Sequence, residues 1–240
     1  MSELFGLNPI KEALKNNLEF NKIWVAKNST HRGLEDIYRL AKKAHIPIQE
    51  VERSQIEKRF PKENHQGICA SLAEIKYAEV EEILVFAKEK GEAPFVVLLD
   101  EIEDPHNLGA IIRNVEAFGA HGIILPKRRS ALATATVAKA SAGAMSMVKI
   151  ARVSNLVQTI EKLKKAGLWI CGTDMSGDNL YQADLSGALA VVIGGEGNGM
   201  RDLTKKHCDF MLSIPMRGQI NSLNASVASG IVLSEIAKGR

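Results

Sequence analysis

The sequence predicts an α/β protein with two domains, a small α/β domain followed by a larger domain built on a parallel sheet. Of its 240 residues, 45% are apolar and 25% are charged, a composition that excludes disordered, collagen-like and coiled-coil proteins. At roughly 150 residues per domain, this length fits two modest domains. From residue 95 onward, apolar segments of strand length alternate with stretches of helical spacing. This alternation is typical of a parallel α/β sheet.

Residues 1–75 are predicted to form the small first domain. Apolar spacing there indicates strands at 22–26 and 47–51 and a helix at 33–44. The segment contains 12 basic and 10 acidic residues and is therefore not strongly basic. An acidic stretch at 76–93 follows, with apolar residues at helical spacing before Gly91 and Pro94. We predict a linker helix there, and a second domain over 94–240.

The second domain is predicted to contain strands that are covered on both faces, because several segments are apolar at nearly every position. These strands are expected at 95–99, 122–125, 147–150, 168–172, 189–193 and 210–214. Residues 224–238 have apolar side chains at helical spacing and are predicted to close the domain as an amphipathic helix.

The cysteines, the lengths of the apolar runs and the first residues argue against several classes of protein. Cys69, Cys171 and Cys208 form neither an even set nor a closely spaced pair, so we expect thiols in a reducing compartment and no metal site. No apolar run reaches the ~20 residues of a membrane span. The first residues lack a basic segment followed by an apolar one, so no secretory signal is expected. We predict a cytoplasmic protein without a membrane partner.

The charge distribution says more than the net charge of +3. Between Glu116 and Glu161 there is no acidic residue, although the interval carries six cations. These cations are Lys127, Arg128, Arg129, Lys139, Lys149 and Arg152. Such a stretch either faces a polyanion or forms a solvated surface whose counter-charges come from elsewhere in the fold. We take Lys127, Arg128 and Arg129 as the candidate residues for binding such a polyanion.

Ligands of open α/β sheets bind beyond the carboxyl ends of the strands, so the segments after the strands are the first candidates for a site. In the first segment, 100–119, a helix is expected to begin near His106. Asn107 and Arg113 would then lie near the strand exit. Alternatively, Asn107 is a helix cap and Arg113 is a surface cation.

The second segment, 193–200, contains Gly194, Gly195, Gly197 and Gly199 around Glu196. Glycines let a backbone approach a ligand closely, and a structural turn is the alternative. The dinucleotide-binding and P-loop patterns both fail here, so neither NAD nor ATP is expected.

The third segment, 212–226, places Ser222 and Asn224 at the start of the last helix. Ser222 is alternatively a helix N-cap. No nucleophile elbow surrounds any serine, and no histidine has the spacing of a metal ligand.

Together, the three segments resemble the three motifs of the TrmH/SpoU branch of the SPOUT RNA methyltransferases. They are Asn107-Leu-Gly with Arg113 and Gly119, Gly-Gly-Glu-Gly-Asn-Gly from Gly194, and Ile214-Pro-Met with Ser222-Leu-Asn-Ala-Ser. The match covers about 95–240 in the family order. The sequence departs from the usual pattern at Asn114 and Glu116, where small residues are common. The first domain resembles the L30e-like substrate-binding domain of many members.

The resemblance implies transfer of a methyl group from S-adenosylmethionine to a ribose 2′-hydroxyl of RNA. The architecture looks most like the bacterial enzymes that methylate a guanosine in large-subunit (23S) ribosomal RNA. A transfer-RNA ribose methyltransferase and a non-catalytic RNA-binding scaffold of the same fold are the alternatives. The family also implies a C-terminal trefoil knot and a homodimer through the catalytic domain, with active sites that include residues of both chains.

The resemblance also assigns roles to single residues. The residues implied in catalysis are Asn107, Arg113, Glu196, Ser222 and Asn224, and those implied in donor binding are Thr173, Gly194, Gly195, Ile214 and Leu223. Glu196 would fix Arg113 or a loop amide. A guanidinium stays protonated near pH 7, so we interpret Arg113 as stabilising the developing alkoxide or gripping the adjacent phosphate, in place of accepting a proton.

Overall fold

A computed structural model describes residues 3–15, 18, 20–29, 31–72, 77–131, 135–197, 199–219 and 222–240. The chain divides into two compact units. The first comprises residues 1–75 together with 133–143, which include helix α6 (Ala135–Ala140). The second comprises residues 76–132 and 144–240.

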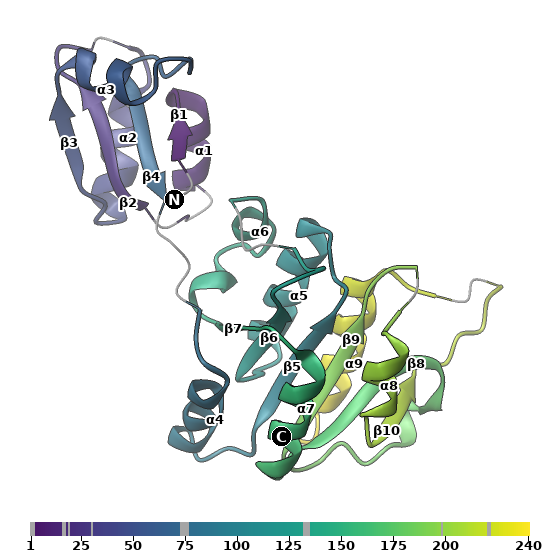
Figure 1. Cartoon of the computed structure of the whole chain (residues 1–240). Coiled ribbons are helices and arrows are strands. Elements are labelled where there is room, and N and C mark those ends of the chain that lie inside the picture. Colours follow the sequence, from purple (N-terminus) through teal and green to yellow (C-terminus); the bar gives the residue numbers. More distant parts are fainter. Residues whose placement is uncertain are drawn as a thin grey trace. The chain divides into compact units, whose positions relative to one another are not determined.

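The first unit is a mixed sheet covered by helices (Figure 1). Its elements are β1 (Glu3–Phe5), α1 (Leu7–Lys15), β2 (Phe20–Ala26), α2 (Leu34–Lys43), β3 (Ile48–Val51), α3 (Arg53–Arg59) and β4 (Ile68–Leu72). The strand order is β1-β4-β2-β3, where β4 runs antiparallel to both of its neighbours and β2 runs parallel to β3. Apolar side chains of α1, α2, β2 and β4 form its main core.

The second unit contains a parallel sheet in the order β10-β8-β9-β5-β6-β7. Its elements are α4 (Val80–Glu89), β5 (Phe95–Asp100), α5 (Pro105–Ala117), β6 (Gly122–Pro126), η1 (Ala144–Ser146), β7 (Lys149–Val153), α7 (Leu156–Lys165), β8 (Trp169–Asn179), η2 (Leu180–Gln182), β9 (Leu189–Gly194), α8 (Asp202–Lys206), β10 (Phe210–Ser213) and α9 (Ala225–Ala237). The predicted parallel α/β sheet is therefore confirmed.

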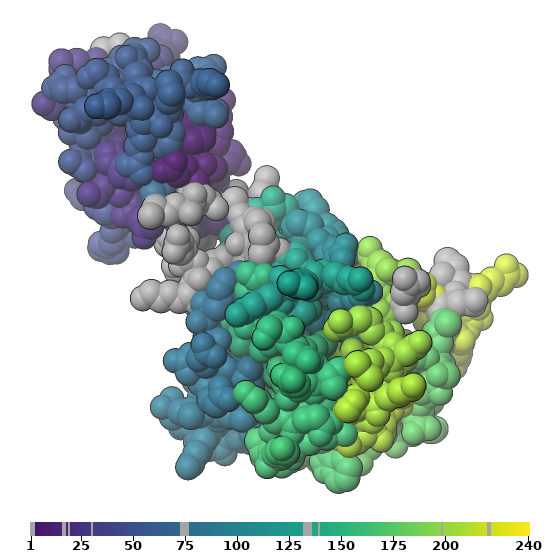
Figure 2. All heavy atoms as spheres, in the orientation of Figure 1, coloured from purple at the N-terminus to yellow at the C-terminus, as the bar shows by residue number. Residues whose placement is uncertain are grey.

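Helices cover both faces of this sheet, as the unbroken apolar strands predict. On one face, Val80 and Ile83 of α4 and Ile160 of α7 pack against Val96 and Val192 of the central strands. On the other face, α5 and α9 pack against each other and contact β6 and β9 (Figure 1). The space-filling view shows yellow-green α8 against green α7 (Figure 2). His207, directly after α8, places its Nδ1 2.7 Å from Oε1 of Glu161 in α7.

The predicted strands 147–150 and 168–172 differ most from the observed ones. The strand expected at 147–150 begins only at Lys149, because the backbone N–H groups of Met147 and Val148 bond to Ala144 O in the turn around η1, and it runs on to Val153. The strand expected at 168–172 continues to Asn179, because β10 pairs with this extension as far as Asn179 after a register shift. In the described part of the chain, no helix is long and apolar enough to cross a membrane. The C-terminal knot stays a prediction.

Candidate active site

The carboxyl ends of the parallel strands lie at one edge of the sheet, and the candidate residues gather there. β5 ends at Asp100 and β9 ends at Gly194, and these two residues are register partners in neighbouring strands. The segments that follow them, 101–107 and 195–201, are therefore neighbours as well, although about 90 positions separate them in the sequence.

Asn107 lies in the first turn of α5 and is free to face this edge. The helix cap is Asp104, whose carboxylate accepts hydrogen bonds from the backbone N–H groups of His106 (3.1 Å) and Asn107 (3.2 Å). The reading of Asn107 as a cap is therefore wrong. Pro105 occupies the first helical position, where its lack of an N–H has no cost. The Asn107 side chain is buried and available for another partner.

One hydrogen-bonded network joins a residue from each of the three sequence segments. Asn107 Nδ2 donates to Glu196 Oε1 at 2.9 Å, and Asn224 Nδ2 donates to Asn107 Oδ1 at 2.9 Å. Asn224 Nδ2 also donates to Glu196 Oε1. The carboxylate thus accepts from two amides, which fixes both the loop and the orientation of the amides.

Asn224 has a second function as the N-cap of α9. Its Oδ1 accepts from the backbone N–H of Ser226 at 3.0 Å and of Val227 at 3.3 Å, which leaves Nδ2 for the network. Ser222 is exposed and lies two residues before the cap, so its reading as the N-cap is wrong. Leu223, between them, is half-buried.

The glycine segment forms a tight reversal at the end of β9. Gly195 and Gly199 form an isolated antiparallel bridge, and Gly197 and Gly199 have φ angles of 94° and 67°. A β-carbon on Gly194 would lie 2.5 Å from the backbone of Gly199 and Met200. The glycines therefore allow two stretches of the protein's own backbone to approach each other closely.

The far end of this loop is held by an ion pair between the buried Asp100 and the partly exposed Arg201, which the sequence reasoning missed. The Asp100 carboxylate is fully buried and accepts from Arg201 through Nε (2.8 Å), Nη2 (2.7 Å) and the backbone N–H (3.0 Å). A signal was present, because Asp100 is the only charged residue of the strand Phe95–Asp100 and stands at its carboxyl end.

A cavity of about 430 Å³ opens where these segments meet. Its lining residues are Glu101, Ile102, Glu103, Asp104, Asn107, Gly195, Glu196 and Gly199. Four of these residues carry carboxylates, and one of them, Glu101, is paired with Arg129. The three others leave a lining whose charge favours cationic groups. The cavity borders the network of Asn107 and Glu196.

Arg113 is not part of this network. It is exposed on α5, and the described residues offer its side chain no hydrogen bond or ion pair. Within one chain the Glu196 carboxylate accepts from the side-chain amides of Asn107 and Asn224, and among the described residues it does not bind Arg113. The role of Glu196 toward Arg113 stays a prediction. Asn114, the next residue, turns toward α9 and donates through Nδ2 to Ser226 O, at 2.9 Å.

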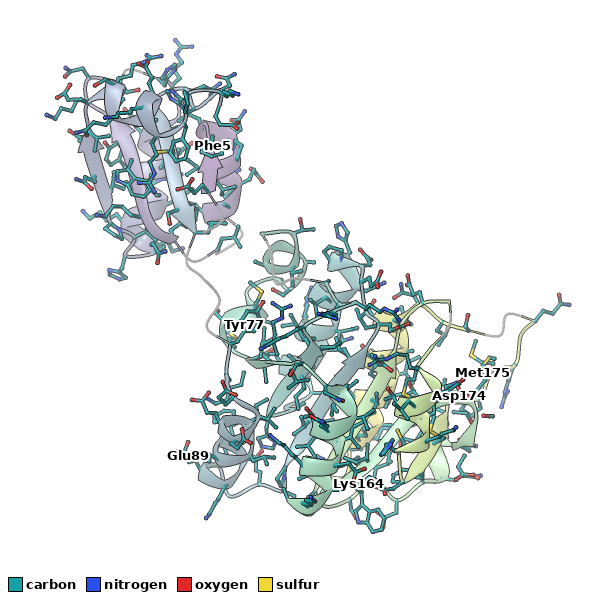
Figure 3. All side chains as sticks on the ribbon, viewed as in Figure 1. Phe5, Tyr77, Glu89, Lys164, Asp174 and Met175 are labelled. Atoms are coloured by element: carbon teal, nitrogen blue, oxygen red, sulfur yellow. The ribbon has the colours of Figure 1, made fainter. Side chains whose placement is uncertain are left out.

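The other candidates for donor binding lie at the same sheet edge. The hydroxyl of Thr173, in β8, donates to the carbonyl of Val192 in β9 at 3.2 Å. Ile214 directly follows β10 and is half-buried. Beside Thr173, Asp174 (labelled in Figure 3) pairs with Lys205 Nζ of α8 at 2.6 Å. This hydrogen bond, with those from Ser176, lowers the pKa of Asp174 to about 2.

The cationic candidates lie on the loop after β6. Lys127, Arg128 and Arg129 are exposed, and Arg129 Nη1 donates to Glu101 Oε1 at 3.0 Å. Glu101 also lines the cavity, so the basic loop reaches its rim. The side chain of Lys139 lies outside the described residues. Among the residues that are described, no group of three or more His, Cys, Asp or Glu is arranged to hold a metal ion.

Comparison with known proteins agrees with this geometry. The family model described as SpoU rRNA Methylase family matches residues 94–234, and the model for RNA 2′-O ribose methyltransferase substrate binding matches residues 4–78. The TrmH-family protein YacO of Bacillus subtilis (strain 168), whose name describes a tRNA/rRNA methyltransferase, is 44% identical over 238 residues. That alignment covers 99% of this chain and 95% of YacO.

Two solved structures share the fold along nearly the whole chain. The SpoU methyltransferase AviRb from Streptomyces viridochromogenes, in complex with AdoMet, has a TM-score of 0.71 at 24% identity and covers 98% of this chain and 89% of its own. An AdoMet-bound rRNA methyltransferase from Sinorhizobium meliloti has a TM-score of 0.67 at 23% identity, with 98% and 86% covered.

Proposed function

Since the chain belongs to the SpoU/TrmH family of AdoMet-dependent RNA 2′-O-methyltransferases, we propose that it methylates the ribose 2′-hydroxyl of a guanosine in 23S ribosomal RNA. The observation that carries a catalytic function is the convergence of Asn107, Glu196 and Asn224 in one network beside a cavity. A scaffold that only binds RNA has no need of such a network.

Two features support binding of the methyl donor at the edge of the cavity: the positive charge of the donor and the backbone of the loop beside the cavity. S-adenosylmethionine carries a sulfonium cation, which a carboxylate-lined cavity favours. We propose that the backbone of Gly194 and Gly195, together with Ile214 and Leu223, holds the donor, and that Thr173 fixes the neighbouring strand. This sulfonium supplies an activated methyl group, so this chain's residues chiefly align the ribose oxygen.

The reaction forms a bond between the 2′-oxygen and the methyl carbon and breaks the carbon–sulfur bond. The sulfur leaves as the neutral thioether of S-adenosylhomocysteine, and the hydroxyl proton passes to solvent. Arg113 is proposed to stabilise the developing alkoxide by its charge. Asn107 and Asn224, held by Glu196, are proposed to orient the ribose, and the exposed Ser222 is proposed to bind the substrate beside them.

Arg113 can perform this role at the site of a second copy of the chain. Within one chain it is exposed and does not join Glu196, whereas the cavity offers carboxylates that suit a guanidinium. Val227, at the start of α9, is 51% exposed and adds apolar surface near the same helix pair. We propose a homodimer through the catalytic domain in which each site takes Arg113 from the partner.

Mixing two inactive variants tests this arrangement. Arg113→Ala and Glu196→Gln are each expected to lose most of the methyl transfer activity. If the sites are shared, one site of each mixed dimer contains both native residues, so an equilibrated equimolar mixture recovers about a quarter of the native activity. No recovery from a mixture shown to exchange subunits contradicts shared sites.

The substrate is tested by methylation in vitro. The purified chain, radiolabelled donor and either 23S rRNA or total tRNA are incubated, and ribose methylation is mapped. We expect a single methylated guanosine in 23S rRNA. Methylation of tRNA alone would favour the alternative substrate. Absence of heat in calorimetry with S-adenosylmethionine would favour the non-catalytic scaffold.

A further inference from the structure

Tyr77 is an exposed aromatic residue that is fixed to the edge strand of the large sheet. The backbone N–H of the next residue, Ala78, donates to the carbonyl of Ile150 at 2.8 Å, and Ala78 forms a parallel bridge with Ala151 of β7. The Tyr77 residue is nevertheless 38% exposed (labelled in Figure 3). The backbone is therefore held in place while the ring keeps surface toward solvent.

Arg152 connects this ring to the basic loop after β6. Its guanidinium carbon lies 5.2 Å from the centre of the Tyr77 ring, and its Nη2 donates to the carbonyl of Lys127 at 3.0 Å. The backbone N–H of Lys127 in turn donates to Val153 O at 2.8 Å. Nε of Arg152 is buried and has no hydrogen-bond partner among the described residues, so the guanidinium keeps unused donor capacity in this position.

The same surface continues from the basic loop to the cavity. Lys127 and Arg128 are exposed, and Arg129 reaches Glu101 at the cavity rim with an N–O distance of 3.0 Å. The Tyr77 ring beside the edge strand β7 and the guanidinium of Arg152 are thus connected to the basic loop that carries the exposed Lys127 and Arg128. Arg129, paired with Glu101, connects the same loop to the rim of the cavity that Asn107 and Glu196 line.

We propose that Tyr77 stacks a base of the RNA next to the methylated nucleotide, while Lys127 and Arg128 bind the phosphates between them. This inference rests on the proposed function for the position of the reacting nucleotide. Sites for single-stranded nucleic acid combine a cationic track with aromatic rings on which bases stack. A duplex keeps its bases stacked on one another. The recognised RNA is therefore a single-stranded segment, such as a loop.

The test compares Tyr77→Leu with Tyr77→Phe in the full chain. The probe is a single-stranded RNA of about 12 nucleotides, within the usual range of such sites, with one 2-aminopurine whose fluorescence reports stacking. Tyr77→Leu is expected to weaken binding about tenfold, since stacking of one base contributes a factor of about 5 to 150. Tyr77→Phe is expected to keep the native affinity and the fluorescence change.

Tyr181→Leu is the matched control, because Tyr181 is 54% exposed but lies on η2, and no cation contacts its ring among the described residues. It is expected to bind the probe as the native chain does. The salt dependence separates the two kinds of contact: Arg128→Gln lowers the slope of log K against log salt by about 1, whereas Tyr77→Leu leaves it unchanged.

Native affinity of Tyr77→Leu, at an unchanged melting temperature, would overturn the inference. So would loss of binding in both Tyr77→Leu and Tyr77→Phe, since that pattern assigns the effect to the hydroxyl group. A native chain that does not bind the RNA at all would instead contradict the proposed function, which keeps the two failures distinct.

Discussion

Gly195 has no room for a side chain, because the carbonyl oxygen of Glu101 lies 2.1 Å from the position of a β-carbon. Glu101 itself has a φ of 62°, a conformation that costs a residue with a side chain about 1 kcal/mol or more. The exit of β5 and the start of the glycine loop are thus packed backbone against backbone, and Glu196 follows directly.

Gly195→Ala is expected to displace the loop, lower the free energy of unfolding by about 2 kcal/mol and weaken donor binding. Calorimetric titration with S-adenosylmethionine and denaturant unfolding measure the two effects. Gly218→Ala is the control, since a β-carbon there meets no heavy atom of the described residues within 4 Å. Equal behaviour of the two variants would contradict the tight packing at Gly195.

Arg201→Ala is expected to destabilise the protein because, among the described residues, it leaves the fully buried carboxylate of Asp100 with the backbone N–H of residue 201 as its one hydrogen-bond donor. Breaking a buried pair costs several kcal/mol, and the partial exposure of Arg201 reduces this to about 2 kcal/mol. Urea unfolding measures the difference. Arg128→Ala removes an exposed guanidinium and should change stability by less than about 0.5 kcal/mol.

Glu196→Gln is expected to reduce methyl transfer at least about tenfold at saturating donor, because at least 1.4 kcal/mol of orientation is lost. The carboxylate accepts from two amides, and a glutamine in its place can turn an NH₂ group toward one of them. Glu103→Gln is the control: it changes a carboxylate of the same cavity that lies outside the network. Similar kcat values in both variants would contradict a role of Glu196 in positioning the amides.

His121 is expected to make the stability depend on pH. Its buried Nδ1 accepts from the backbone N–H of Phe95 at 3.0 Å, so the neutral ring carries its proton on Nε2, 3.0 Å from Glu92 Oε2. Burial lowers the pKa of this histidine below its usual value, although Glu92 opposes the shift. The contribution to stability is therefore complete above the unfolded pKa, near 6.5. It is lost as the pH falls through the lower folded pKa.

The measurement is the free energy of unfolding between about pH 7.5 and 5. His121→Gln keeps an acceptor and a donor without a titrating group, so its stability should fall less steeply on acidification than that of the native chain. His106→Gln, at an exposed histidine, should retain the native slope. An equal slope for His121→Gln would show that His121 is protonated without cost in the folded state.

Much of the architecture follows from the sequence alone. Strands such as Phe95–Asp100 and Leu189–Gly194 are apolar at nearly every position, which marks them as central strands of a parallel sheet. Because the carboxyl ends of parallel strands share one edge, the segments that contain Asn107, Glu196 and Asn224 were expected to hold the site, and the structure places these three side chains in contact.

The local sequence pattern could not predict which residues cap the helices or which side chains pair across the fold. Residues 104, 222 and 224 all have side chains suited to an N-cap, and only the observed backbone shows that Asp104 and Asn224 are the caps. In the same way, Asn114 departs from the family pattern, but its contact with Ser226 O explains the residue as a tie between α5 and α9.

The sequence by itself determined the two α/β domains, the family and the residues at the sheet edge, because apolar periodicity and short motifs are local properties of the chain. Only the tertiary structure decided that Asp100 holds Arg201, that Gly195 is pressed against Glu101, and that Arg113 does not meet Glu196 in one chain. The contacts of Asp100 with Arg201 and of Glu101 with Gly195 join residues more than 90 positions apart, and their distances depend on how the sheet and helices pack.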